Sequence, residues 1–312
     1  MSRSRLLFLA AAALAVGVAA FAVQPRAAEP PNPTTPEAET TAAGDAPSTP
    51  SIGPSPAEAL PSLTTLAPGF ELGRLALPTP SALGPGALTY VRVDPTLVRL
   101  EVRAASLRDK TLRKASEWGE SPPDAKAIAV INSSMFKDDW LSSLGRFVVN
   151  GTAQNKGWAE QQNSLFVADP VSKAGPRAAL VNLGCADRDA TVAAWQTQVQ
   201  SIRMVGCSRE NVWAQEPRSW SSALVGADAQ GRILFLHTRA PYTMHDLVDM
   251  LLAVPLDIVA LHYAEGGPEA SLYVRGPGVE RHEVGSYETG FVENDQNADE
   301  WDLPNVIVAI AP

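Results

Sequence analysis

The sequence predicts an α+β fold: a strand-rich single domain with a mixed, twisted sheet and a few flanking helices. Two observations support this class. Apolar or alternating runs of strand length recur between residues 88 and 310, and they outnumber the one clear helical pattern, which begins at Thr243. No second linker and no internal repeat interrupts this part of the chain, so we treat it as one domain.

The composition limits the classes of function. The chain has 312 residues, a formal net charge of −9, 45% hydrophobic residues and 19% charged residues, which is a globular balance. An acidic chain lacks the positive field that nucleic acids require, so we expect no nucleic-acid partner. Two cysteines and four histidines are too few for a zinc cluster, and we expect no metal and no cofactor.

The N-terminus has the pattern of an export signal. Arg3 and Arg5 precede an apolar run that leads to Ala20-Phe21-Ala22, a small-x-small cleavage pattern. We therefore predict a signal peptide over residues 1–22 and an exported protein that is periplasmic, secreted or at the cell surface. The alternative is an uncleaved anchor, because the run approaches the ~18 residues that can span a membrane. Membrane association, transient or retained, would then occur through this segment.

A linker follows the signal. Residues 23–67 are rich in Pro, Thr and Ala and show no period that could bury one face, so we expect this segment to be disordered. The predicted folded domain is residues 68–312.

Strands are predicted from alternation and from apolar runs. Residues 88–94 and 97–103 both alternate, and Asp94-Pro95 between them predicts a turn, so the two segments read as a hairpin. Buried strands are expected at four further apolar runs, residues 126–132, 232–237, 258–263 and 304–310.

One helix and one disulfide are also expected. Thr243 is a candidate N-cap, Asp246 follows three residues later, and apolar positions recur at helical spacing to Ala253. This helix lies between two predicted strands. Cys185 and Cys207 are more consistent with a disulfide than with two free thiols in an exported protein.

The segment Glu265-Gly266-Gly267-Pro268-Glu269 is the strongest candidate for a functional site. It directly follows an apolar strand. Two glycines allow a tight turn with backbone N–H groups close to a ligand, and the two glutamates place carboxylates on either side. This arrangement suits a sugar or a phosphate. The alternative is an ordinary β-turn with solvated glutamates.

Other candidates are short polar groups at strand ends and one histidine. Asn132 and Ser133 end a buried strand, and Gln200, Ser201 and Arg203 offer an amide, a hydroxyl and a guanidinium within four residues. His245 is a candidate acid or base. The alternatives are a strand cap, a surface arginine and a structural histidine.

Taken in order, several motifs resemble the phosphodiester glycosidases over residues 88–310. They are Val130 to Phe136, Leu144 to Gly151, Gln200-Ser201, Val225 to Phe235, Ala264 to Ser271 and Leu303 to Ile307. Three positions depart from the family pattern. Glu265 replaces an Asp, Ser222 stands where an Arg often occurs, and Ile202-Arg203 replaces Gly-Pro.

The resemblance implies a hydrolase that cleaves the glycosidic C–O bond of a sugar-1-phosphodiester, so the expected partner is a carbohydrate or sugar-phosphate substrate. Glu265 would stabilise the sugar cation or activate water, with Glu269 and His245 as further acid–base candidates. Substrate binding would fall to Asn132, Ser133, Gln200, Ser201, Arg203, Gly266 and Gly267, with Arg203 and the glycines on the phosphate. Three alternatives stay open: a glycan-binding protein without turnover, a phosphodiesterase that cuts P–O, and a purely structural exported domain.

Overall fold

The computed structural model describes residues 62–84, 86–120 and 123–312. The predicted signal peptide, its alternative as a membrane anchor and most of the predicted linker lie outside these residues. No helix within the described ranges is long and apolar enough to cross a membrane.

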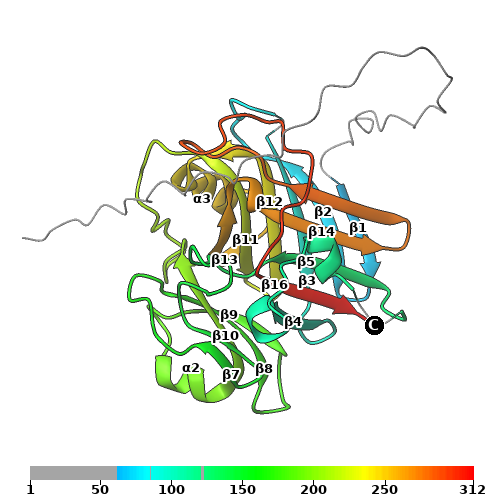
Figure 1. The fold of residues 1–312 in the computed structure, drawn as a ribbon, viewed down its shortest axis with the longest axis vertical. Coiled ribbons are helices and arrows are strands. Elements are labelled where there is room, and N and C mark those ends of the chain that lie inside the picture. The colour runs from blue at the N-terminus through cyan, green and yellow to red at the C-terminus, as the bar shows by residue number, and fades with distance from the viewer. Residues whose placement is uncertain (1–61, 85, 121–122) are drawn as a thin grey trace, which may run out of the picture. The chain divides into compact units, whose positions relative to one another are not determined.

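The strands of the described chain form two sheets (Figure 1). The larger has 11 strands in the described residues: nine in the order β1-β2-β3-β12-β11-β13-β10-β6-β7, with β8 beside β10 and β9 beside β8. Their bounds are β1 Ser62–Ala67, β2 Phe70–Ala76, β3 Ala87–Val93, β6 Phe147–Val149, β7 Thr152–Asn155, β8 Ser164–Pro170, β9 Ala178–Asn182, β10 Trp195–Arg203, β11 Trp220–Asp228, β12 Ile233–Tyr242 and β13 Ile258–Gly266.

The smaller sheet has the strand order β15-β14-β5-β16-β4. These strands are β4 Arg99–Ala104, β5 Ala127–Asn132, β14 Ser271–Gly276, β15 Val279–Val284 and β16 Asn305–Ala311. The helices are α1 Ala115–Trp118, α2 Arg188–Ala194 and α3 Met244–Ala253, with 3-10 turns η1 Ala105–Leu107 and η2 Gly267–Glu269.

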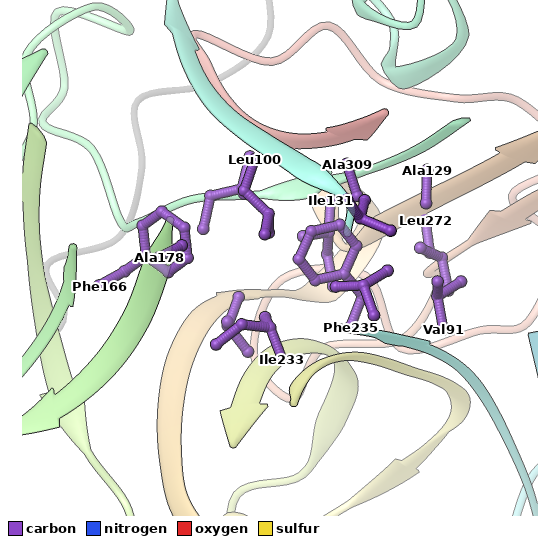
Figure 2. Close-up of a cluster of buried hydrophobic side chains, with 14 of the residues drawn as sticks. Val91, Leu100, Ala129, Ile131, Phe166, Ala178, Ile233, Phe235, Leu272 and Ala309 are labelled. Atoms are coloured by element: carbon purple, nitrogen blue, oxygen red, sulfur yellow. The ribbon is translucent and has the colours of Figure 1, made fainter. Parts of the chain in front are cut away.

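The main hydrophobic core lies between the two sheets. Along β12, Ile233 and Phe235 point into this core, while Leu234 and Leu236 point to the opposite face. Successive strand residues face opposite sides, so one apolar run can serve two layers. Figure 2 shows Ile233 and Phe235 of the larger sheet among Ile131, Leu272 and Ala309 of the smaller one.

Each sheet has a second apolar layer on its outer face. The apolar side of α3 packs on the larger sheet, where Leu247 and Leu251 join the cluster that contains Leu234 and Leu236. On the smaller sheet, Trp118 of α1 packs in the cluster that includes Val130 and Val308. Burial on both faces explains why these strands read as continuous apolar runs.

The expected strand, helix and strand around Thr243 are confirmed as β12, α3 and β13. The Thr243 hydroxyl accepts a hydrogen bond from the Asp246 N–H at 3.2 Å, which caps the helix as the sequence predicts. The structure also joins Cys185 and Cys207 in a disulfide with a Cα–Cα distance of 6.0 Å.

The expectation of a mixed sheet is corrected, because every strand pair in the described residues is antiparallel. Strands β12 and β13 do run in the same direction, but β11 lies between them and is antiparallel to both. The helical crossover therefore skips one strand position.

The predicted hairpin of residues 88–94 and 97–103 is wrong. Both segments are strands, and the turn at Asp94 is present, with the Val98 N–H donating to the Asp94 carbonyl at 2.9 Å. However, β3 pairs with β2 and β12 in the larger sheet, whereas β4 pairs with β16 in the smaller one. Alternation of apolar and polar residues indicates that a strand has one buried face, but it does not identify the strand that pairs with it.

The predicted end of the linker also needs correction. Residues 62–67, assigned to the linker, form strand β1, which pairs with β2 in the larger sheet. Leu66 and Ala67 belong to the main core. Two adjacent apolar residues at the end of a polar segment are too short a pattern to indicate a strand.

Strand β1 allows a test of its contribution to stability. Leu66 is 6% exposed and Leu63 on the same strand is 53% exposed. Leu66→Ala should lower the free energy of unfolding by ~2–3 kcal/mol, since it leaves a cavity in the core. Leu63→Ala should change it by less than ~0.5 kcal/mol. Urea unfolding of both variants measures this difference, and equal effects would contradict the packing of β1 on the core.

Candidate active site

The chain passes from the larger sheet to the smaller one directly after Glu265. Strand β13 ends at Gly266 in the larger sheet, the 3-10 turn η2 follows, and β14 begins at Ser271 in the smaller sheet. A third segment closes against this crossing, because the Gly285 N–H donates to the Ala270 carbonyl at 2.7 Å. The candidate site is therefore built where two sheets meet.

Glycine is required at the crossing because neighbouring groups leave no space for side chains. A Cβ on Gly266 would lie 2.3 Å from the Tyr263 hydroxyl oxygen, and one on Gly285 would lie 2.0 Å from the Gly267 carbonyl oxygen. Gly267 has φ +67°, and a Cβ there would lie 2.4 Å from a Glu288 carboxylate oxygen. Only glycine permits both the left-handed backbone and the close approach.

Asn132 holds the crossing from the smaller sheet. Its Nδ2 donates to the Glu269 carbonyl at 3.0 Å, and its Oδ1 accepts from the Ser271 N–H at 2.8 Å. From the larger sheet, His237 Nε2 donates to the Ala270 carbonyl at 3.2 Å. The structure thus brings Asn132 to the predicted glycine turn, where its amide binds backbone groups on both sides of Ala270.

Two predicted carboxylates and one further carboxylate surround the glycines. Glu265 is 9% exposed, and its Oε1 accepts from the Gly266 N–H at 3.0 Å. Glu269 is fully buried in η2. Glu288, which the sequence analysis did not select, lies against Gly267. The tight turn predicted here is present, but its glutamates are buried, so the interpretation as a solvated β-turn is wrong.

The Tyr263 hydroxyl lies among these acids. Burial raises its pKa well above the ordinary value, and the negative charges of Glu265 and Glu288 raise it further. The hydroxyl therefore stays protonated at neutral pH and can donate a hydrogen bond to an anionic or polar ligand. Tyr263 precedes Glu265 by only two residues, but a β-bulge in the pairing of β13 with β11 lies between them, so the alternation of a regular strand does not predict this approach.

An aromatic cluster and an arginine adjoin Tyr263. The ring centroids of Trp213 and Trp220 lie 5.4 and 6.3 Å from that of Tyr263. The Arg218 guanidinium lies 5.5 Å from the Trp220 ring and 3.6 Å from a Glu288 carboxylate oxygen. The sequence does not indicate these three residues, because they lie more than forty positions from Tyr263 and belong to no recognisable motif.

The predicted pair Gln200 and Ser201 is buried and engaged by the protein. Gln200 Oε1 accepts from the N–H groups of Arg146 and Ala159, and its Nε2 donates to the carbonyls of Ala159 and Gln162. The Ser201 hydroxyl donates to the Tyr263 carbonyl. Ser201 thus connects β10 to the strand that carries Glu265, while Gln200 holds a loop.

Ser133 is part of a buried network behind the site. Its hydroxyl donates to Asn305 Oδ1, and its carbonyl accepts from His262 Nε2 at 3.0 Å. The other His262 nitrogen, Nδ1, lies 3.1 Å from the Ser164 hydroxyl. This network links the loop after β5 to the middle of β13.

The structure places the remaining two candidates elsewhere. Arg203 Nη1 donates to Asn182 Oδ1 at 3.0 Å, beside the turn that leads to Cys185. His245 lies in the first turn of α3, with Nδ1 3.8 and 3.6 Å from carboxylate oxygens of Asp246 and Asp249. The guanidinium beside the glycine turn and Glu288 is that of Arg218. The described residues contain no cluster of three or more His, Cys, Asp or Glu side chains arranged for a metal ion.

Comparison with known proteins identifies relatives of this arrangement. The family model described as phosphodiester glycosidase matches residues 125–310, which include the glycine turn and all its supports from β5 to β16. No curated protein matches the chain in sequence.

Two solved structures share the fold. One is the catalytic domain of zebrafish N-acetylglucosamine-1-phosphodiester alpha-N-acetylglucosaminidase, auto-inhibited by its pro-peptide, with a TM-score of 0.51 and 13% identity over 80% of this chain and 85% of that chain. The other is a hypothetical protein from Synechocystis, with a TM-score of 0.51 and 10% identity over 82% of this chain and 64% of that chain.

The glycine turn can be tested with a matched pair of substitutions. Gly267 and Gly278 have φ of +67° and +70°, but only Gly267 has a neighbour within 4 Å of its missing Cβ. Gly278→Ala should cost ~1 kcal/mol of stability from backbone strain alone. Gly267→Ala adds a clash with Glu288 and should cost at least ~1 kcal/mol more. Thermal unfolding compares them, and equal losses would show that Glu288 does not confine the turn.

His262 should make stability depend on pH. Burial lowers its pKa from 6.5 to about 4, although the hydrogen bond to Ser133 opposes this shift. Between these values the unfolded chain binds a proton that the folded chain does not, so stability falls as pH drops below 6.5. Between pH 7 and 5, the wild type should lose ~2 kcal/mol more than His262→Gln. Urea unfolding at both pH values measures this, and equal losses would contradict the buried neutral state.

Proposed function

Because the chain belongs to the phosphodiester glycosidase family, we propose that it hydrolyses the glycosidic C–O bond of a sugar-1-phosphodiester. The observation that carries the proposal is the Glu265 carboxylate at the end of β13, next to a glycine turn and a protonated Tyr263 hydroxyl. These groups combine a negative charge for the sugar with hydrogen-bond donors for the phosphate.

The leaving group determines what such a site must supply. A phosphate ester leaves as a stabilised anion, so it needs less protonation than a sugar alkoxide does. The enzyme must instead stabilise positive charge on the sugar ring and negative charge on the departing phosphate. Two opposite charges in one small site require groups of opposite polarity on its two sides.

Glu265 is assigned to the sugar side. As a carboxylate it stabilises an oxocarbenium-like transition state or activates the attacking water. Its position is held by β11 on one side, where Ala223 pairs with Glu265 in register, and by the Gly266 N–H at its Oε1. A fixed carboxylate needs no reorganisation during the reaction, which is the basis of electrostatic catalysis.

The phosphate side is assigned to the backbone of Gly267, the Tyr263 hydroxyl and Arg218, because the Gly266 N–H already donates to Glu265. Arg218 takes the role expected of Arg203, because Arg203 bonds Asn182 while Arg218 lies beside Glu288 at the turn. An arginine fork matches phosphate geometry and remains charged at any working pH.

The Trp213 ring supports a carbohydrate ligand, because it is partly exposed and packs against the buried rings of Trp220 and Tyr263. Aromatic rings offer an apolar surface together with polar edges, and a sugar ring has apolar C–H faces between its hydroxyls. The Trp213 indole N–H is directed to Glu216 at 3.2 Å, which fixes this ring at the edge of the cluster. We assign the sugar to Trp213 at the edge of this cluster rather than to Asn132, Ser133, Gln200 or Ser201.

Export is part of the proposal. The disulfide between Cys185 and Cys207 supports an oxidising compartment, because such bonds rarely persist in the cytosol. The N-terminal charge and apolar pattern of residues 1–22 supports the same location.

A glycan-binding protein without turnover is the second candidate. It is favoured by the substitution of Glu for the family's Asp at position 265, together with the hydrogen bond between Glu265 and its own neighbouring N–H. A longer carboxylate shifts its oxygens by ~1 Å, and a displacement of that size can cost ~100-fold in rate.

The catalytic assignment predicts the effect of one isosteric change. Glu265→Gln removes the charge but keeps the shape, so kcat for release of sugar from a UDP-sugar should fall ~100-fold or more. Glu280→Gln is the matched control, because Glu280 is an exposed glutamate on β15 that accepts from the Tyr273 hydroxyl and lies 3.8 Å from His282 Nε2, away from the glycine turn. Reducing-sugar release across a panel of UDP-sugars measures both variants.

The outcomes separate the candidates. Near-full activity in Glu265→Gln would remove Glu265 from the mechanism. Sugar binding without product in the wild type would favour the glycan-binding protein. Hydrolysis in ¹⁸O-labelled water distinguishes the bond that breaks, since C–O cleavage places the label in the sugar and P–O cleavage places it in the phosphate.

A further inference from the structure

Two arginine side chains make cation–π contacts with the indole ring of Trp158. The Arg146 guanidinium carbon lies 5.0 Å from the ring centroid, and that of Arg188 lies 4.6 Å from it. The two guanidinium carbons therefore lie within roughly 10 Å of each other, because both contact the same ring. Two positive charges are concentrated at one place in a chain whose net charge is −9.

The protein builds this cluster with a buried anchor. Gln200 is 1% exposed, and its amide binds the backbone of Arg146 on one side and the loop of Ala159 and Gln162 on the other. Trp158 lies on that loop. The Arg146 side chain is held further, with Nε donating to Gln198 Oε1 at 2.6 Å and Nη1 to the Lys156 carbonyl at 2.8 Å.

Neither guanidinium is neutralised within the protein. Among the described residues, no carboxylate forms an ion pair with Arg146 or Arg188, and the protein acceptors of Arg146 are all neutral. Arg92 and Arg232 behave differently, because each has a carboxylate oxygen at 2.6 Å. The Arg146–Trp158–Arg188 cluster thus keeps its full double charge.

The free donors point to an anionic ligand. Stacking occupies the face of a guanidinium and leaves its N–H edge available. Nη2 of Arg146 and the whole Arg188 guanidinium remain without a protein acceptor in the described residues. Burial without a counter-charge lowers the pKa of Arg146, so a bound anion would restore the interaction that desolvation removes.

This cluster is linked to the proposed active site through strand β10. Gln200, which anchors the cluster, is followed by Ser201, whose hydroxyl donates to the Tyr263 carbonyl two residues before Glu265.

We propose that Arg146, Trp158 and Arg188 form a second binding site, which takes a further anionic group of a polymeric glycan. This rests on the proposed function in so far as the glycan's reacting end lies at Glu265. A simple sugar-1-phosphodiester carries one phosphate, which the glycine turn accommodates. A second cationic site is useful only for a substrate that repeats its negative charge, such as a phosphate-bearing polysaccharide.

The test uses two polymers of equal length, phosphorylated dextran and uncharged dextran. Titration calorimetry measures their affinity for the full chain at low and high salt. We expect binding of phosphorylated dextran only, weakened by salt because the contact is electrostatic. Arg146→Gln/Arg188→Gln should weaken it at least ~10-fold, as expected for the loss of two charge-assisted contacts.

Two further variants make the result specific. Arg177→Gln/Arg275→Gln removes the same charge from two exposed arginines elsewhere and should leave the affinity within about 2-fold. Arg188→Gln alone removes a side chain that has no hydrogen bond to any other described residue, so it should fold normally and weaken binding ~3-fold or more.

The outcomes distinguish this site from the active site. Failure of the wild type to bind phosphorylated dextran, or equal binding by the two double variants, would overturn the proposal. Hydrolysis of UDP-sugars should be unchanged in Arg146→Gln/Arg188→Gln, because neither arginine is assigned to the proposed active site. Absence of hydrolysis in the wild type, with charge-dependent polymer binding intact, would overturn the proposed function and leave the second site standing.

Discussion

The passage of the chain from one sheet to the other at Gly266 to Ala270 is the constraint on which the candidate site depends. Two sheets with a shared core must stay close, so the connection between β13 and β14 has little room. Glycine backbone fits there, and buried donors from both sheets, Asn132 and His237, hold its carbonyls. Unpaired backbone groups in this place would carry a large desolvation cost.

The tight packing of this connection also determines the electrostatics of the candidate site. Because the crossing is tight, Glu265 and Glu288 are held close to the Tyr263 hydroxyl in a region with little solvent. A low local dielectric strengthens every charge interaction in the site, which is what stabilisation of a charged transition state requires. The aromatic cluster and Arg218 then add a surface and a cation at its edge. The residues that connect the two sheets are therefore also the residues that form the candidate site.

The predictions that succeeded rest on local physical chemistry. Apolar runs identified β5, β12, β13 and β16, and a capping hydroxyl identified α3. The predictions that failed concern which strands pair with each other. The hairpin of residues 88–103 and the mixed sheet both required knowledge of which strand lies beside which, and alternation is the same whichever partner a strand takes. Strand β1 was missed because its apolar signal is two residues long.

The sequence by itself determined the strand-rich class, the capped helix and the glycine turn flanked by carboxylates, since each follows from backbone preference or side-chain period. Only the tertiary structure decided what the polar candidates do. Asn132 holds the turn, Gln200 anchors the loop that carries Trp158, and Arg218 rather than Arg203 lies beside Glu288 at the turn. The physical reason is that a buried amide or guanidinium takes its role from the groups that surround it, and those come from strands distant in the chain.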